Sequence, residues 1–171
     1  MNKIIIIYYS SSDKEKDAGA TEYMAQSISS QIKKANVAVT IKKVDELIKI
    51  EELQEYDAII VGTPCYMGNM AGPIKEFFDK TYKLLGKLEG KIGGAFATST
   101  FVGGGNETAL MAVHHAFLVH GMIIQGDYQG DHYGPVAVSP VGDIRKFLIE
   151  NAEVTERFAK RIVELTKKIK P

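Results

Sequence analysis

Three segments of this 171-residue chain combine hydroxyl side chains with glycines, and such groups can bind a phosphate or a flat ligand. The first segment runs from Ser10 to Thr21 and ends in a Gly-Ala-Thr turn at the expected start of a helix. A helix N-terminus has free amide groups and a partial positive charge, so a phosphate can bind there without Lys or Arg. The alternative is a simple helix cap in a solvated loop. The candidate phosphate-binding residues are Ser10, Ser11, Ser12, Gly19, Ala20 and Thr21.

The second segment, Val61–Pro73, follows an apolar run and precedes a helix-like pattern, so it lies at the carboxyl end of an expected strand. Ligands bind at that end of the strands in open α/β sheets. Gly68 and Gly72 can adopt positive φ, and the small residues let a flat ring such as a flavin approach the main chain. The alternative is a tight strand–helix connection in which Cys65 only packs. The candidate wall residues are Pro64, Cys65, Tyr66, Met67, Gly68 and Asn69.

The third segment, Ser99–Glu107, contains three consecutive glycines. Ordering such a run has a high entropic cost, so a bound ligand or a close backbone approach is the better explanation for it. No Lys follows the glycines, as a Walker A loop would require, and the GxGxxG spacing of dinucleotide-binding folds is absent after the first expected strand. The candidate binding residues here are Thr98, Ser99, Thr100, Phe101, Gly103 and Gly104.

The histidines have no partners at metal-ligand spacing, so no metal site is expected. His114 and His115 lie on an expected helix, where surface or capping roles are favoured. His120 precedes a glycine at the end of that helix, where an imidazolium would be favoured by the helix dipole. Its functional alternative is to donate a hydrogen bond to a ring carbonyl that becomes anionic on reduction.

The elements that must position these segments alternate between strands and helices, which predicts a parallel sheet with helices on both faces. Five strands fit the order 2-1-3-4-5, the flavodoxin-like doubly wound sandwich, which binds flavin between strands one and three. In that topology the loops after strands one, three and four open on the same edge. Expected strands are residues 4–9, 37–44, 58–61, 92–98 and 122–124, the last resuming at 136–138. Expected helices include residues 74–84, 107–119 and 143–169, and a helix with Met24, Ala25, Ile28 and Ile32 on one face precedes them.

Length and composition indicate one domain, residues 1–171, of an ordinary globular protein. Lys plus Arg and Asp plus Glu balance at 21 each, and no basic stripe occurs, so nucleic-acid binding is not expected. A single cysteine, Cys65, excludes an internal disulfide. No apolar run approaches a membrane span and no signal-peptide pattern is present, so a cytoplasmic protein is expected, without membrane insertion.

The same motifs resemble those of the WrbA-type flavoproteins. The matching residues are Lys3–Ser10, Gly62–Gly72, Gly103–Glu107 and His120–Met122, and the middle motif, GTPxxxGNMxG, is the most specific. These proteins are flavodoxin-like NAD(P)H:quinone oxidoreductases that bind FMN. The resemblance implies two-electron transfer from NADH or NADPH to a quinone-type acceptor, in a homodimer or homotetramer.

The resemblance also implies roles for particular residues. Ser10 and the Gly19–Thr21 turn would hold the phosphate, Pro64–Met67 would flank the flavin ring, and Thr98–Gly104 would wrap its other edge. His120 would face the ring's pyrimidine end, and Tyr133 resembles a tyrosine that the family places near the flavin. His120 and Tyr133 are therefore the candidate catalytic residues.

The chain departs from the family pattern in the first segment, which is longer and contains the charged run Asp13–Asp17. Its carboxylates would repel a phosphate, so this run is expected to bulge outward. A competing function is that of a flavodoxin, a one-electron carrier, although carriers usually present an acidic face and this chain has no net charge. A flavin-free receiver-like module is disfavoured, because Gln125 stands where such a module would carry a Lys.

Overall fold

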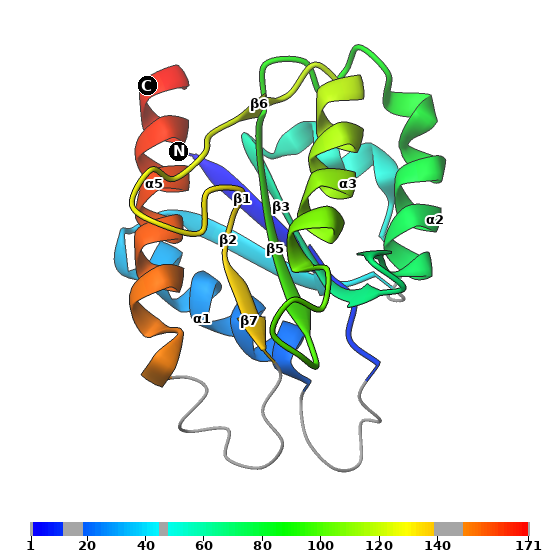
Figure 1. Cartoon of the computed structure of the whole chain (residues 1–171). Helices are drawn as coiled ribbons and strands as arrows, with labels where there is room; N and C mark the ends of the chain where they lie inside the picture. The colour runs from blue at the N-terminus through cyan, green and yellow to red at the C-terminus, as the bar shows by residue number, and fades with distance from the viewer. Residues whose placement is uncertain (1, 12–18, 45–47, 139–148, 171) are drawn as a thin grey trace.

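The structure, a computed structural model, describes residues 2–11, 19–44, 48–138 and 149–170. A twisted sheet forms the middle layer, with α1 and α5 on one face and α2 and α3 on the other (Figure 1). The helices are α1 (Ala20–Lys34), α2 (Gly72–Lys80), α3 (Asn106–Val119) and α5 (Ala152–Ile169), with short 3-10 helices η1 (Ile50–Glu55) and η2 (Thr81–Leu84). The strands are β1 (Lys3–Tyr8), β2 (Ala38–Lys43), β3 (Ala58–Tyr66), β4 (Asn69–Met70), β5 (Ile92–Ser99), β6 (Ile123–Ile124) and β7 (Val136–Val138).

The sheet has the order β2-β1-β3-β5-β6, and these strands pair in parallel. Both β6 and β7 pair with β5, at Ile92–Gly93 and at Ala97–Ser99 respectively. They therefore form one interrupted fifth strand, and the predicted order 2-1-3-4-5 and the predicted interruption are confirmed. The carboxyl ends of β1, β3 and β5 lie together at the lower end of the molecule in Figure 1.

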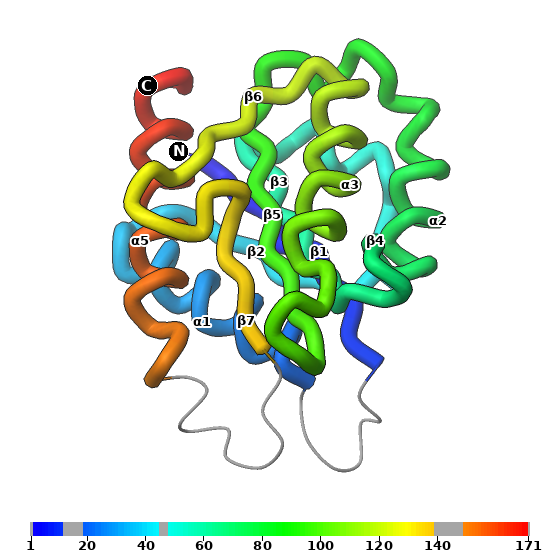
Figure 2. The backbone as a smooth tube through the Cα atoms, in the orientation of Figure 1, coloured from blue at the N-terminus to red at the C-terminus, as the bar shows by residue number. Residues whose placement is uncertain are grey.

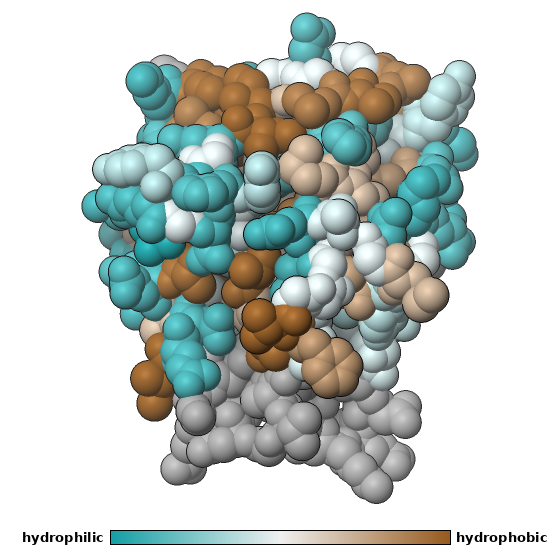
Figure 3. Space-filling model, viewed as in Figure 1, coloured by the Kyte–Doolittle hydropathy of each residue, from teal (hydrophilic) through white to brown (hydrophobic). Residues whose placement is uncertain are grey.

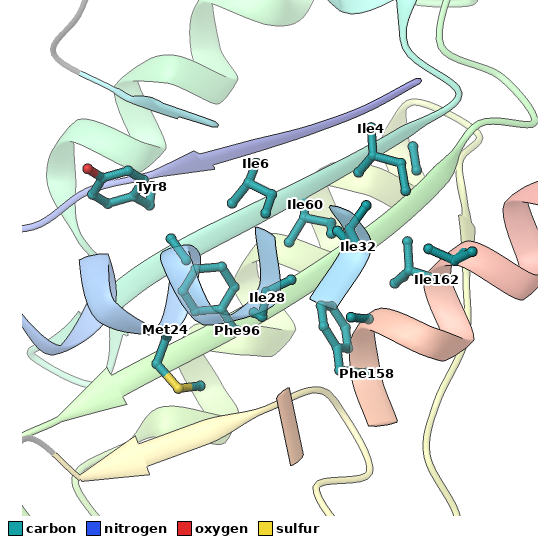
Figure 4. Packing of buried hydrophobic residues seen from close by; sticks show 14 of the residues in the cluster. Ile4, Ile6, Tyr8, Met24, Ile28, Ile32, Ile60, Phe96, Phe158 and Ile162 are labelled. Atoms are coloured by element: carbon teal, nitrogen blue, oxygen red, sulfur yellow. The ribbon is translucent and has the colours of Figure 1, made fainter. Parts of the chain in front are cut away.

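Strand β1 is buried on both faces, which explains why its sequence is a continuous apolar run. Ile4, Ile6 and Tyr8 pack with α1 and α5, as Figure 4 shows, whereas Ile5 and Ile7 pack on the opposite side with residues of α2 and α3. Burying each of these isoleucines contributes about 1.5–3 kcal/mol. The hydrophobic layers on both faces of this strand hold its carboxyl end, and hence Ser10, in place.

The third strand is longer than predicted, because β3 continues through Tyr66 instead of ending at Val61. Its pairing with β5 extends to Pro64, and β4 then folds back on Cys65 and Tyr66 as an antiparallel hairpin. Met67 and Gly68, the two residues of the turn, have φ of 51° and 73°. Two positive φ values at a two-residue turn match the twist of a hairpin. Gly68 therefore adopts the predicted positive φ, whereas Gly72 keeps an ordinary φ as the first residue of α2.

The remaining elements largely follow the expectation. The connection from β2 to β3 contains η1, and the helix expected over 74–84 is α2 followed by η2. The start expected for the last helix at Asp143 lies outside the described residues, as do Ser12 and the run Asp13–Asp17. Among the described helices, none has the length and apolar character that crossing a membrane requires.

Candidate functional site

A cavity of about 200 Å³ opens at the carboxyl ends of β1, β3 and β5. All the residues that line it were candidate binding residues from the sequence. They are Ser10, Ser11, Gly19, Ala20, Thr21, Pro64, Cys65, Tyr66, Thr98, Ser99 and Thr100. Segments that lie far apart in the chain therefore meet at one rim, because parallel strands end at the same edge of the sheet.

The N-terminus of α1 forms one wall of this cavity. Gly19 precedes the helix in an extended conformation and, as a glycine, has no side chain with which to cap it. The first amide groups of a helix have no partner within it, so they can receive an anion. The described lining contains no Lys, Arg, Asp or Glu, so a phosphate here would be held by amides, hydroxyls and the helix dipole.

Two buried hydroxyls connect α1 to β5 at the floor of the cavity. Thr21 Oγ1 and Thr98 Oγ1 are 2.7 Å apart, and both side chains are almost fully buried. One hydroxyl hydrogen makes this bond, and within the described part of the chain the second could be donated to a ligand. The pair thus fixes the start of α1 against the sheet and also offers a hydrogen-bond donor.

Tyr66 crosses from the end of β3 toward the first segment. Its hydroxyl donates a hydrogen bond to Ser11 Oγ at 2.9 Å, and its ring packs edge-on against Tyr9 with centroids 6.4 Å apart. The hairpin beneath it is held by Thr63 Oγ1, which accepts a bond from the Ala71 amide at 2.9 Å. Tyr66 therefore occupies a defined position at the mouth of the cavity.

The glycine-rich loop after β5 is organised by its own polar groups. Ser99 Oγ donates to the Phe101 carbonyl at 2.8 Å and accepts from Asn106 Nδ2 at 2.9 Å. The Ser99 hydroxyl hydrogen is thus used within the loop, so Ser99 shapes the cavity rather than offering a donor. Asn106 lies in the matching motif Gly103–Glu107 but was not among the candidate binding residues; an Asn immediately after three glycines, at the start of an expected helix, was the available signal.

This loop also packs against the β3–β4 hairpin. A Cβ at Gly105 would lie 3.0 Å from Gly68 Cα and 3.1 Å from Cys65 Sγ, and the Cys65 thiol donates to the Gly105 carbonyl at 3.1 Å. The close backbone approach expected from the glycine run is therefore present, between two loops that both border the cavity. Cys65 is used in this packing contact.

Three exposed apolar side chains lie in the described loops that border the cavity. Met67, Phe101 and Val102 are 103%, 73% and 90% exposed, respectively. Met67 lies at the hairpin turn, and Phe101 and Val102 lie in the glycine-rich loop. Figure 3 also shows hydrophobic residues at the lower end of this face, where the strands end. A flat apolar ring could cover these side chains while a polar tail enters the cavity.

The structure does not bring His120 to this cavity. His120 follows the last residue of α3, a 14-residue helix whose other end borders the cavity, and that helix spans about 21 Å. Its side chain is buried beside a separate groove of about 360 Å³ between α2 and α3. Thr81 Oγ1 donates to the Phe78 carbonyl, so His120 Nε2–H must be the donor to Thr81 Oγ1, at 2.8 Å. His120 therefore makes its hydrogen bond to a residue of the same chain, away from the cavity.

Tyr133 lies beside the cavity rather than in it. It borders a small hollow of about 100 Å³, together with Glu107 and Leu110 of α3. Tyr133 is 49% exposed. Its main-chain carbonyl accepts a hydrogen bond from His114 Nε2 at 2.5 Å. The surface role favoured for His114 is therefore wrong, because this imidazole is buried and bound to the Tyr133 main chain.

Burial makes both histidines sensitive to acid. It lowers the pKa of His114 and of His120 below the ordinary value of 6.5. Below pH 6.5 the unfolded chain therefore binds protons that the folded chain does not bind. The contribution of these two histidines to the free energy of unfolding is fully present above pH 6.5 and is lost as the pH falls below that value. We expect the Tm to drop between pH 7.5 and 5.5, and His114→Gln or His120→Gln to reduce that drop. Equal slopes in the wild type and in both variants would contradict this origin.

Comparison with known proteins agrees with this geometry. A sequence model of the family described as NADPH-dependent FMN reductase matches residues 42–133, which is more than half of the chain. Among solved structures, a flavodoxin, WrbA-like protein from Agrobacterium tumefaciens has a TM-score of 0.79 and 22% identity, with 98% of this chain and 99% of that chain covered. Flavodoxin 1 from Bacillus cereus has a TM-score of 0.74 and 19% identity, with 95% and 98% covered. A flavodoxin from the domain Archaea has a TM-score of 0.68 and 26% identity, with 94% and 99% covered.

The solved structures thus share the flavodoxin-like fold, in which the cavity occupies the carboxyl edge of the sheet. The matched region contains β3, the hairpin, α2, β5, α3 and Tyr133, and hence two of the three segments around the cavity. On this match, the chain belongs to the NADPH-dependent FMN reductase family.

Proposed function

We propose that this protein binds FMN at the cavity and transfers two electrons from NADH or NADPH to a quinone-type acceptor. The observation that carries the proposal is the cavity itself, in which hydroxyls and helix amides converge at the carboxyl ends of three strands. Membership of a family named for NADPH-dependent FMN reduction supports the same conclusion. Bound FMN would supply the redox chemistry.

The residues present fit such a cofactor. The amides at the start of α1, with the hydroxyls of Ser10, Ser11 and Thr21, would hold the phosphate without a cationic side chain. The apolar rim of Met67, Phe101 and Val102 would exclude water from the flat ring. The protein's part is therefore to bind, orient and desolvate the cofactor, with no side chain required to break a bond.

A one-electron carrier function is the second candidate. It is favoured by the 26% identical archaeal flavodoxin, which is matched over 94% of this chain. The balance of 21 basic and 21 acidic side chains disfavours it, because an acidic docking face is typical of such carriers. Catalytic turnover with pyridine nucleotides distinguishes the two functions.

The test begins with the purified chain, reconstituted with FMN and freed of unbound cofactor. A bound-flavin absorption spectrum supports the site, and rapid oxidation of NADH or NADPH in the presence of benzoquinone supports the reductase. Bound flavin with negligible nucleotide oxidation supports the carrier instead. A protein that remains colourless after reconstitution overturns both.

The hydroxyl pair at the cavity floor gives a sharper prediction. Thr21→Val removes a donor and leaves Thr98 unpaired, so the Kd for FMN should rise roughly tenfold or more, the effect of losing one hydrogen bond to a charged group. Fluorescence titration of FMN measures this change. Thr166→Val is the matched control, because Thr166 Oγ1 is equally buried but donates to Ile162 within α5. An equal rise in Kd for both variants would refute a local role for Thr21.

A further inference from the structure

The segment between β6 and β7, residues 125–135, is held by charges that the proposed chemistry does not use. Asp127 in this segment is 7% exposed, and its Oδ1 accepts the Gln129 amide at 3.0 Å. Its Oδ2 lies 2.6 Å from Arg157 Nε and 2.6 Å from Arg161 NH1. Figure 2 shows the segment passing beside α5, the helix that carries both arginines.

The same arginines hold the neighbouring main chain. Arg161 NH2 donates to the carbonyls of Gln125 and Gly126, at 3.0 and 2.5 Å. Arg157 also lies 3.9 Å from Asp131 Oδ2. The hydrogen bonds that Asp127 accepts from Arg157 and from the Gln129 amide, together with the charges of Arg161 and Arg157, keep the pKa of Asp127 below its ordinary range despite its burial. One buried carboxylate thus fixes the segment to α5 through two cationic side chains.

The other end of the segment is fixed to α3 and β5. The Tyr133 carbonyl accepts from His114, and the next residue, Gly134, has no room for a Cβ, which would lie 2.3 Å from the Ala95 carbonyl oxygen. The Pro135 carbonyl then accepts the Ala97 amide at 2.9 Å. The main chain on both sides of Tyr133 is therefore immobilised, while its phenol stays half-exposed.

These contacts place the Tyr133 hollow next to the cavity. Strand β7 begins at Val136, after Gly134 and Pro135, and pairs with Ala97–Ser99; Thr98 and Ser99 line the cavity. Glu107, which borders the hollow, follows Asn106, and Asn106 is bonded to Ser99. The Asn106–Ser99 bond thus joins a residue that lines the cavity to the neighbour of a residue that borders the hollow.

We propose that Asp127, Arg157, Arg161 and His114 are positioning residues that hold Tyr133 as a wall of the acceptor site, where its phenol hydroxyl donates a hydrogen bond to the acceptor's carbonyl oxygen. This role rests on the proposed function, because it requires FMN in the neighbouring cavity. The acceptor class is a planar compound with an aromatic or quinonoid ring and a carbonyl oxygen. A tyrosine offers both an apolar face and a hydroxyl donor for such a compound.

The first test follows the segment itself and needs no cofactor. In Asp127→Asn, Arg161 loses its carboxylate partner and Arg157 keeps the more distant carboxylates of Asp131 and Glu153. Amide hydrogens of residues 127–134 should therefore exchange at least about tenfold faster, the effect of weakening hydrogen bonds to charged groups. Exchange elsewhere should remain as in the wild type. Lys160→Gln, on an exposed part of the same helix, is the control. Faster exchange over the whole domain, or no change in 127–134, overturns the positioning role.

The second test asks whether the charges act through Tyr133. With FMN-loaded protein, Asp127→Asn and Tyr133→Phe should each raise the KM for benzoquinone several-fold, whereas kcat and the Kd for FMN should stay within about twofold, since a hydrogen bond to a neutral acceptor is worth about 1 kcal/mol. The double variant should match Tyr133→Phe alone, because residues that act as one unit are not additive. Additive effects overturn the proposal.

Two safeguards separate the possible failures. If Asp127→Asn does not fold, Arg157→Gln takes its place in both tests, since the Arg157 side chain is 20% exposed and Arg161 still neutralises Asp127. A wild-type chain that binds no FMN overturns the proposed function and the acceptor role of Tyr133. In that case the exchange experiment still decides whether Asp127 holds the segment.

Discussion

Gly105→Ala should raise the Kd for FMN at least about tenfold, equivalent to about 1.4 kcal/mol, and lower the Tm by roughly 5–10 °C. Gly105 has a φ of 87°, a left-handed conformation that costs a residue with a Cβ about 1–2 kcal/mol. The added methyl group would also lie 3.0 Å from Gly68 Cα and 3.1 Å from Cys65 Sγ, so the glycine-rich loop and the hairpin must separate. Because both border the cavity, its walls move apart. Flavin fluorescence titration and thermal unfolding measure the two effects.

Gly103→Ala is the matched control for this prediction. Gly103 has a similar φ of 73°, but a Cβ there would meet nothing within 4 Å. The control therefore has the conformational penalty without the contact, and FMN affinity should change much less than in Gly105→Ala. Equal losses of affinity in the two variants would show that the approach of loop and hairpin does not shape the site.

Gly62→Ala should destabilise the fold by about 3 kcal/mol or more, at the upper end of overpacking effects. Gly62 on β3 lies directly opposite Phe96 on β5, and both residues are fully buried. A Cβ at Gly62 would lie 2.1 Å from Phe96 Cζ, so the ring must leave its position between the sheet and the helices α1 and α5. Denaturant unfolding measures the loss.

The cause can be checked by making room for the new methyl group. Phe96→Leu should destabilise the wild-type background but be less harmful, or even favourable, beside Gly62→Ala, with a coupling of about 0.5–3 kcal/mol. Gly72→Ala is the control, because a Cβ there meets nothing within 4 Å at the start of α2; the expected change is within about 1 kcal/mol. Additive effects of the Gly62 and Phe96 substitutions would exclude the steric explanation.

Local patterns in the chain were enough to predict the order of the sheet and most of the cavity. The apolar run of β1 indicates a strand covered on both faces, and parallel strands must end at a common edge. Hydroxyls and glycines immediately after three such strands therefore had to meet. For this reason, Ser10, Thr21 and Pro64 could be assigned to one cavity without coordinates.

Other features depended on which surfaces face each other across the fold. The sequence motif around His120 suggested a position beside the flavin ring. Because His120 follows α3, however, the length of that helix places it at the end away from the cavity, where it bonds to Thr81. The continuation of β3 beyond Val61 depends on pairing with β5 as far as Pro64 and with β4 at Cys65 and Tyr66, and local sequence preferences do not indicate such pairing.

The contacts around Tyr133 show most clearly the difference between what local sequence predicts and what tertiary packing decides. Asp127 and Arg157 are 30 positions apart and have the appearance of ordinary surface charges in the sequence. Only the packing of α5 beside residues 125–135 removes them from water and makes them partners. The sequence by itself determined where strands end and which groups gather there, because hydrophobic periodicity and chain direction are local. Tertiary structure alone decided which distant charges and imidazoles pair, because pairing depends on distances in space and on burial.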